Sequence, residues 1–294
     1  MKSWWQAHRP TTRRMVQLYA ALLQNAHLRG FADGKIYDGP AKAACVPGLN
    51  CYSCPAAVGA CPLGSLQSAI AAGKKGALFY VIGALLLFGL ALGRVICGWL
   101  CPAGFVQELL HKLPTPKLKK NKVTRALSWL KYAILAVFVL LLPPLLNSPT
   151  FCKFICPAGT AEGAVSLLAN PVNEGWFAML GALFTNKFVI LTLVLTACVF
   201  VYRSFCRFLC PLGALYSLFA RLALLGVRVD THSCTNCGKC LRVCPMDIRR
   251  VGDRECIHCG QCIDACPEKA ITLRAGKLTL KGPDPAVAQR RKQA

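Results

Sequence analysis

Two runs of cysteines near the end of the chain have a spacing that gathers thiolates around a metal cluster. Each run follows the pattern Cys-x2-Cys-x2-Cys-x3-Cys-Pro, over residues 234–245 and 256–267. Such a loop wraps three thiolates around one cubane, and the fourth thiolate comes from the other run. The spacing therefore predicts two 4Fe-4S clusters, one held by Cys234, Cys237, Cys240 and Cys266 and the other by Cys256, Cys259, Cys262 and Cys244.

A zinc site or a disulfide framework is the alternative interpretation of these runs. Structural zinc usually pairs two short x2 spacings, and it does not use three ligands with a distant Cys-Pro. We therefore favour clusters that carry electrons. His258 lies inside the second run, and we expect it to tune a cluster by hydrogen bonding or charge rather than to bind metal.

A second motif, Cys-Pro-x-Gly, occurs four times upstream of these runs. Three of the four copies have another cysteine four residues earlier, which is one helical turn, so both sulfurs project from one face. The proline can begin a new helix at its first position, and a helix N-terminus favours anionic thiolates. The copies begin at Cys61, Cys101, Cys156 and Cys210, and the upstream partners are Cys97, Cys152 and Cys206.

Two of these pairs are predicted to supply a third cluster at the membrane boundary, namely Cys97, Cys101, Cys206 and Cys210. A fourth cluster is predicted from Cys45, Cys51, Cys54 and Cys61. The remaining pair, Cys152 and Cys156, is then a redox-active dithiol, a disulfide or part of an alternative ligand set. That alternative set is Cys51, Cys54, Cys152 and Cys156, whereas the solitary Cys198 is expected to be a small buried apolar residue.

The elements that position these cysteines are predicted to be membrane helices. The chain has 294 residues, of which 55% are apolar, and its mean hydropathy is +0.45. Apolar stretches over 76–96, 129–146 and 187–202 are long enough, with their flanks, to cross the hydrocarbon core. The segment 12–31 contains more polar residues, and it either crosses with its polar side against other helices or lies at the interface.

The predicted fold class is mainly α: a polytopic bundle of about four transmembrane helices followed by a two-cluster ferredoxin-like domain. We expect an N-terminal helix and cysteine-rich segment over 1–75 and transmembrane helices with three CxxxCP motifs over 76–227. The two-cluster domain is expected over 228–275. Residues 276–294 are expected to form a basic, disordered tail.

The positive charge predicts the orientation of the chain. The formal net charge is +23, and the segment 112–131 is rich in lysine and arginine, whereas 145–186 holds only Lys153. The positive-inside rule then places 112–131 and the ferredoxin domain in the cytoplasm. The outer cysteines would be separated from the inner ones by a helix of about 31 Å, so electron transfer across it would need a mobile quinone or sunken clusters. Basic stripes with interleaved aromatic residues are absent, so no nucleic-acid partner is expected.

The motif Cys97-Gly-Trp-Leu-Cys101-Pro, followed by Cys206-Arg-Phe-Leu-Cys210-Pro-Leu-Gly-Ala-Leu-Tyr and the twin cysteine runs, resembles the NapH-type membrane polyferredoxins. These proteins are related to the NosR and CcoG proteins, and the resemblance covers about residues 76–270. It implies a multi-pass iron–sulfur protein of a prokaryotic cytoplasmic membrane that passes electrons from quinol to a partner redox protein. The pair Cys152/Cys156 and the segment 45–55 depart from the family pattern and indicate a further redox station outside.

The resemblance implies an electron-transfer subunit of a quinol dehydrogenase, linking lipid-borne quinone to other redox proteins. Its CcoG branch suggests an alternative function, an accessory protein that reduces copper or iron during assembly of another complex. Glu108 and His111 lie three residues apart on the helix expected after Cys101, so they are candidates for handling quinone protons. We favour the interpretation that both residues mark the polar end of an interfacial helix.

Overall fold

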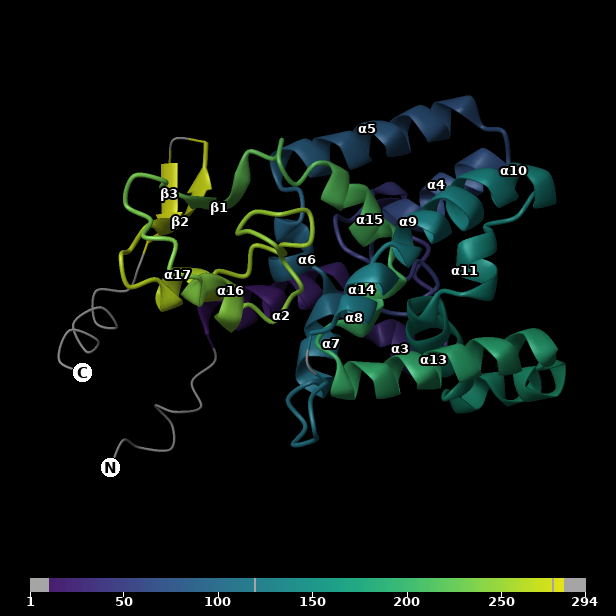
Figure 1. Ribbon diagram of the computed structural model, residues 1–294. Helices are drawn as coiled ribbons and strands as arrows, with labels where there is room; N and C mark the ends of the chain where they lie inside the picture. The colour runs from purple at the N-terminus through teal and green to yellow at the C-terminus, as the bar shows by residue number, and fades with distance from the viewer. Residues whose placement is uncertain (1–10, 119, 277, 283–294) are drawn as a thin grey trace.

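The computed structural model describes residues 11–118, 120–276 and 278–282 as a mainly helical protein with a small sheet at one end (Figure 1). Short helices alternate with turns throughout the first third of the chain. Several of them begin at the proline of a Cys-Pro pair, as the fixed φ of proline favours. Their bounds are α2 Thr12–Gln24, α3 Arg29–Asp33, the 3-10 helix η1 Pro40–Ala43, α4 Pro62–Ala71, α5 Lys75–Ala91, α6 Val95–Trp99 and α7 Pro102–Leu110.

The middle of the chain continues in the same way. A π-helical stretch joins α9 to α10, and a second one follows Cys156. The elements are α8 Lys122–Leu127, α9 Leu130–Ile134, η2 Leu135–Leu141, α10 Leu142–Leu146, α11 Thr150–Phe154, η3 Gly159–Val165, α12 Ser166–Leu168, the 3-10 helix η4 Pro171–Met179, α13 Ala182–Phe200, α14 Ser204–Phe208 and α15 Pro211–Leu218.

Within the part of the chain that the structure describes, two helical segments are by length and composition apolar enough to cross a membrane. They are Lys122–Leu146, which comprises α8 to α10, and α13. The third stretch expected from the sequence is shorter than predicted, because α5 has 17 residues and ends at Ala91. Gly93 then adopts φ +50°, and Arg94 caps the short helix α6. In Figure 1, α5 and α13 run along opposite edges of the molecule.

Helix α2 turns its polar side inward and its apolar side outward. Arg13, Gln17 and Gln24 are buried, whereas Leu22 and Leu23 are more than half exposed. With 13 residues, about 20 Å of helix, α2 is too short to cross the bilayer. The helix is thus too short for the crossing arrangement expected for this segment, although its polar side does pack against other helices as that arrangement required.

The C-terminal part is a small module, hereafter the ferredoxin module, over residues 225–281. It has two one-turn helices, each capped by a glycine in the left-handed conformation, and a three-stranded antiparallel sheet of order β1-β2-β3. Strand β3 falls within the segment expected to be a disordered tail, and residues 283–294 of that tail lie outside the described residues. The bounds are β1 Leu225–Val229, α16 Lys239–Val243, α17 Gln261–Ala265, β2 Ile271–Ala275 and β3 Leu278–Lys281.

A buried ion cluster ties the ferredoxin module to the helices. Glu255 of the module accepts hydrogen bonds from Lys131 at 2.6 and 2.7 Å and from Arg94 at 3.2 Å. The Lys131 and Arg94 side chains are fully buried. Buried charges are retained only where they are paired, so this cluster fixes where the module sits on the helices.

Candidate iron–sulfur sites

Four cysteines of the ferredoxin module line one small cavity. They come from both cysteine runs, because the last cysteine of the first run reaches the loop of the second. Val227, Met246 and His258 complete the walls, and the backbone N–H of Val227 donates to His258 Nδ1 at 3.0 Å. We call this cavity the buried ferredoxin site, and its cysteines are Cys244, Cys256, Cys259 and Cys262.

The other cysteines of the two runs lie nearer the surface. The Cys240 side chain is near enough to those of Cys234 and Cys266 to interact with them electrostatically. Cys237 is exposed to solvent. Gly238, before the one-turn helix α16, has φ +70°, a conformation that glycine adopts without strain. We call this group the exposed ferredoxin site; its members are Cys234, Cys237, Cys240 and Cys266.

The two CxxxCP pairs that were predicted to share a cluster also meet around one cavity. One pair lies on α6 and at the start of α7, and the other lies on α14 and at the start of α15. All four side chains are buried. Ile96, Leu49 and Tyr216 are among the apolar residues that close the cavity. We call it the first helical site, and its cysteines are Cys97, Cys101, Cys206 and Cys210.

Each Cys-Pro-x-Gly motif places its cysteine at the N-terminus of a helix. The cysteine sulfur accepts a hydrogen bond from the backbone N–H of the glycine three residues later, as at 3.4 Å between Gly213 and Cys210. A helix N-terminus has unpaired N–H groups and favours negative charge, so it stabilises a thiolate there. The same contact joins Gly64 to Cys61, Gly104 to Cys101 and Gly159 to Cys156.

Buried polar groups surround the first helical site. Gln107 Nε2 donates to the Cys206 sulfur at 3.0 Å. Arg94 and Arg203 are fully buried near the cysteines, each three residues before the first cysteine of its pair. Among the described atoms, Arg94 Nε and Nη2 have no hydrogen-bond partner. Such a cation is stabilised by an anionic group in the site, and four thiolates around a cubane supply one.

Helix α2 braces the loop that carries the first pair, a role that its sequence did not reveal. Arg13 and Gln17 both donate to the carbonyl of Gly98 at 3.0 Å, and Gln24 donates to that of Leu100 at 2.9 Å. These carbonyls lie at the end of α6, where a helix leaves its acceptors unpaired. The helical spacing of Arg13, Gln17 and Gln24 is the signal that could have indicated an inward polar face.

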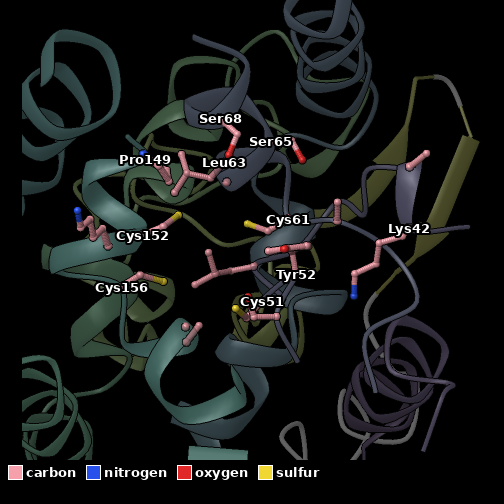
Figure 2. A pocket seen from close by; sticks show the side chains of 18 of the residues that line it. Lys42, Cys51, Tyr52, Cys61, Leu63, Ser65, Ser68, Pro149, Cys152 and Cys156 are labelled. Atoms are coloured by element: carbon pink, nitrogen blue, oxygen red, sulfur yellow. The ribbon is translucent and has the colours of Figure 1, made fainter. Parts of the chain in front are cut away.

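The third CxxxCP pair lies in a wider cavity of about 770 Å³ together with two cysteines from the N-terminal segment. Figure 2 shows the four sulfur-bearing side chains around this space, with Leu63 above them and Tyr52 beside Cys61. Lys42, Lys153 and Lys187 also line the cavity. We call it the second helical site, and its cysteines are Cys51, Cys61, Cys152 and Cys156.

This grouping differs from both ligand sets that the sequence suggested for the N-terminal cysteines. Cys45 and Cys54 are not among the residues that line the cavity. The Cys54 sulfur instead accepts hydrogen bonds from the backbone of Ala56 and Ala57 within its own turn. Cys45 lies in a bridge with Ala60. Of the set Cys45, Cys51, Cys54 and Cys61, only Cys51 and Cys61 line this cavity.

All described cysteines are free thiols, Cys152 and Cys156 included, and Cys198 is fully buried. Among the described residues, no three ligating side chains converge on one point as a single metal ion requires. Each of the cavities described above is lined by four cysteines, the number of thiolates that holds a 4Fe-4S cluster.

Glu108, a candidate for handling quinone protons, is held in an ion-pair network. Arg13 contacts both of its oxygens, at 2.7 and 2.8 Å, Arg203 reaches it at 2.7 Å, and Tyr202 donates to it at 2.6 Å. Burial raises the pKa of Glu108, but the charge of Arg203 and the hydrogen bond from Arg13 outweigh it and bring the pKa to about 2. Glu108 is thus a permanent anion near neutral pH and a structural centre.

His111 lies apart from that network, in a more open place. Its ring packs edge-on against Tyr202, with centroids 5.4 Å apart. Both residues line a cavity of about 520 Å³ whose opposite wall includes Leu241 and Pro245 of the ferredoxin module. Burial lowers the pKa of His111, which favours the neutral form of the ring.

The loops of the first helical site and of the buried ferredoxin site touch each other. Gly98 faces the carbonyl of Ile257 so closely that a Cβ at this position would lie 2.1 Å from the carbonyl oxygen. Trp99 Nε1 donates to the carbonyl of His258 at 2.9 Å. Gly98 and Trp99 stand between the two cysteines of their pair, so these contacts place the two sites next to each other.

Comparison with known families agrees with this arrangement. A 4Fe-4S binding domain matches three times, at residues 76–121, 128–170 and 186–229, so that each match contains one CxxxCP pair. A 4Fe-4S dicluster domain matches residues 226–267. The chain belongs to the family of 4Fe-4S ferredoxin-type membrane proteins that includes NapH, MauN and YccM. It is therefore an iron–sulfur, ferredoxin-type electron transport protein.

Individual relatives are about 30% identical to this chain over the residues that align. An uncharacterized protein of Methanocaldococcus jannaschii is 31% identical over 64% of the chain and 74% of its own length. The ferredoxin-type protein NapH of Escherichia coli is 29% identical over 63% of the chain. The methylamine utilization ferredoxin-type protein MauN of Methylobacillus flagellatus is 30% identical over 56%. The chain spans 59% of that NapH and 52% of that MauN. No solved structure matches the chain significantly.

Proposed function

We propose that the chain is a membrane-bound relay that takes electrons from quinol and delivers them through its iron–sulfur sites to a partner redox protein. The observation that carries this proposal is the contact between the first helical site and the buried ferredoxin site. The backbone of Gly98 meets that of Ile257, and Trp99 bonds to His258. Electron transfer needs short gaps between neighbouring centres, and this contact supplies one.

The donor sets fit 4Fe-4S clusters at three of the four groups of cysteines. The exposed ferredoxin site, the buried ferredoxin site and the first helical site would each hold one cluster through four thiolates. Such a cluster supplies a store for one electron at a time, at a potential that the surrounding charges and hydrogen bonds set. Gln107 and Arg203 would stabilise the first helical site, because both direct N–H groups toward its sulfurs or loop carbonyls.

A membrane location supports the quinol step. We propose that Lys122–Leu146 and α13 cross the bilayer, that α5 contributes a further, shorter hydrophobic element, and that α2 lies against the bundle. The outward side chains of α2, such as Leu22 and Leu23, are then covered by lipid. The basic segment over 112–131, whose second half is the start of the helical segment Lys122–Leu146, would lie at the cytoplasmic face together with the ferredoxin module.

We place quinol oxidation in the cavity lined by His111 and Tyr202. It is lined by Arg207, which follows Cys206 of the first helical site, so the electrons would enter that site first and pass on to the buried ferredoxin site. Quinol loses two electrons and two protons to become quinone. Neutral His111 would accept one proton, the second would pass to water, and the two electrons would enter the cysteine sites one after the other. Glu108 would hold Tyr202 in place through their 2.6 Å hydrogen bond.

Spectroscopy on membranes containing the chain tests this function. We expect a reduced quinol analogue to reduce the iron–sulfur signals anaerobically, and His111→Gln to slow this reduction while dithionite still reduces every cluster. His232→Gln, on an exposed turn of the module, serves as the matched control. If the wild-type clusters stay oxidised with quinol but respond to dithionite, the quinol step is wrong and the electrons come from another donor.

A further inference from the structure

We infer that Cys51, Cys61, Cys152 and Cys156 form a fourth 4Fe-4S site, built as a copy of the first helical site and joined to it through Leu49 and Asn50. The inference extends the proposed relay and rests on it for the electrons that this site would exchange. Nothing in the cysteine spacing groups these four residues, because two come from the N-terminal segment and two from a later repeat.

The first argument is that both helical sites use the same helix starts. In the first helical site, Cys101 and Cys210 cap helices and accept the N–H groups of Gly104 and Gly213. In the second, Cys61 and Cys156 do the same with the glycines three residues later. Two helix N-termini thus direct their positive ends into each site, where four thiolates concentrate negative charge.

These glycines also leave room for the facing cysteines. A Cβ on Gly64 would lie 3.7 Å from the Cys152 sulfur, and one on Gly159 would lie 3.9 Å from the Cys51 sulfur. Each helix start of the second helical site therefore faces a cysteine that belongs to the other half of the site. This mutual facing is what a shared cluster requires.

The second argument is a pair of equivalent glutamines. Gln107 follows Cys101 by six residues, and Gln67 follows Cys61 by six. Gln107 Nε2 donates to the Cys206 sulfur at 3.0 Å, and Gln67 Nε2 donates to the Cys152 sulfur at 3.4 Å.

The backbone contacts of the two glutamines correspond as well. The side-chain oxygen of Gln107 accepts the N–H of Cys206 at 3.4 Å, and that of Gln67 accepts the N–H of Phe151 at 2.9 Å. Both glutamines are buried. A buried amide that donates to sulfur has a clear use where the sulfur is a cluster ligand, because such hydrogen bonds set the cluster potential.

The third argument concerns Cys51, which takes the place of the upstream cysteine that Cys61 lacks. Residue 57, four before Cys61, is alanine. Cys51 comes from the preceding loop, and its backbone N–H donates to Glu162 Oε2 at 2.6 Å. Glu162 follows Cys156 by six residues, the same offset as that of the two glutamines. The helix after Cys156 thus fixes the cysteine that completes the set.

The charge around the second helical site also suits an anionic cluster. A 4Fe-4S core held by four thiolates carries a net negative charge. Lys42, Lys153 and Lys187 line the cavity, and Lys187 donates to the carbonyl of Cys152 at 3.3 Å. Like the buried Arg94 and Arg203 of the first helical site, these lysines place positive charge beside the cysteines. The second site is nevertheless wider and more open than the first.

The two helical sites are linked by adjacent residues of one buried loop. The backbone N–H of Leu49 donates to the sulfur of Cys101 in the first site, and that of Asn50 donates to the sulfur of Cys61 in the second. Leu49, 2% exposed, lines both cavities. The two sites are therefore separated by a single layer of protein rather than by a whole membrane span. A mobile quinone is not needed to connect them.

Iron and sulfide analysis of the anaerobically purified full chain tests the ligand set. We expect Cys61→Ala and Cys152→Ala each to lose about four iron atoms per chain, one cluster, relative to the wild type. Cys45→Ala and Cys54→Ala are the matched controls from the same segment and should keep all the iron. Full iron in Cys152→Ala, or equal losses in Cys45→Ala and Cys61→Ala, would overturn the inference.

A milder variant covers the case in which a cysteine change prevents folding. Gln67→Leu removes the donor to the Cys152 sulfur, so we expect full iron content and a shifted midpoint potential of one cluster in an EPR-monitored redox titration. Gln107→Leu should shift the midpoint potential of a different cluster. Unchanged potentials in Gln67→Leu, or a shift of the same cluster in both variants, would contradict a separate fourth site. Reduction of the remaining clusters by quinol in Cys61→Ala is measured separately and tests the relay itself, so that the two proposals fail independently.

Discussion

The ferredoxin module and the helical sites gather their cysteines in opposite ways. In the module, eight cysteines lie within residues 234–266, and tight loops with left-handed glycines such as Gly238 and Gly260 present them. In the first helical site the pairs come from residues 97–101 and 206–210 and meet only because α6, α7, α14 and α15 pack together. A loop site is encoded locally, whereas a helical site exists only in the assembled bundle.

The two kinds of site also differ in how their charge is compensated. The exposed ferredoxin site has Cys237 at the surface, where water solvates the negative charge. The first helical site is closed to water, and the buried guanidinium groups of Arg94 and Arg203 take the place of solvent there. We therefore expect the helical site to depend on distant residues for both its shape and its charge balance.

The largest expected effect comes from removing a ligand of the first helical site. Cys210→Ser should lose about four iron atoms and stop electron flow from quinol, while dithionite still reduces the ferredoxin clusters. Iron analysis and EPR would measure both effects. Cys198→Ala, which changes a buried cysteine outside the four sites, should keep the full iron content. Full iron content in Cys210→Ser would show that Cys210 is not a cluster ligand, and the comparison between a helical site and a loop site would then fail.

The next effect concerns the ion cluster that attaches the module. Glu255→Gln leaves Arg94 and Lys131 buried without their anion, which should destabilise the protein by about 3 to 5 kcal/mol. Denaturation in detergent would measure this loss. Glu268→Gln, on the exposed surface of the module, should change the stability by less than about 0.5 kcal/mol. Equal stability of the two variants would mean that the module sits independently of the helices.

The Glu108 network should make the helical part sensitive to acid. The folded pKa of Glu108, about 2, lies below its ordinary value of 4.5. The stability that its charge contributes is therefore present above about pH 4.5 and is lost as the pH falls toward 2. Glu108→Gln should be less stable by about 3 to 5 kcal/mol at pH 7, because Arg13 and Arg203 lose their partner. The difference in the free energy of unfolding between the wild type and Glu108→Gln should become smaller below about pH 4.5.

A matched control for this acid effect is the exposed pair Arg29–Asp33. Asp33→Asn should cost at most about 1 kcal/mol at any pH, because exposed ion pairs contribute little. Denaturant titrations of the three proteins at pH 7 and at about pH 3 would compare them. A gap between wild type and Glu108→Gln that stays constant with pH would mean that Glu108 is not the group that titrates.

A smaller effect is expected from a single added methyl group between the two kinds of site. Gly98→Ala would place a Cβ against the carbonyl of Ile257 and force the two loops apart, at a cost of about 1 to 3 kcal/mol. Iron content should be unchanged, whereas stopped-flow reduction of the ferredoxin clusters by quinol should slow. Gly83→Ala, in α5, meets nothing within 4 Å and should leave both unchanged. A normal rate in Gly98→Ala would mean that electrons bypass this contact.

The sequence predicted the helical class, the family and the ferredoxin module because each depends on local patterns. It could not predict that α5 ends at Ala91, since the apolar stretch continues beyond the turn at Gly93. It also left Glu108 as a candidate for proton handling, because its two arginine partners, Arg13 and Arg203, are about 95 residues away in the chain.

The N-terminal cysteines are where the grouping inferred from the structure departs from the grouping expected from the sequence. Cys45, Cys51, Cys54 and Cys61 are close in sequence, and closeness favours a shared site when loops are tight. The turn after Cys54, however, keeps its sulfur among its own backbone amides, while Glu162 holds Cys51 toward the later pair. The inferred set thus depends on a contact between residues more than a hundred positions apart, which no local pattern shows.

The amino-acid sequence by itself determined which side chains can bind iron and which of them form helix-capping pairs, because the cysteine–proline–glycine patterns act within one turn of chain. The tertiary structure alone decided which pairs meet, which charges face them and how near the sites lie to one another. Leu49 illustrates the difference: nothing in its type or neighbours marks it, yet its burial between two cavities sets the separation of the two helical sites. Packing of distant segments creates such positions, and no local pattern encodes them.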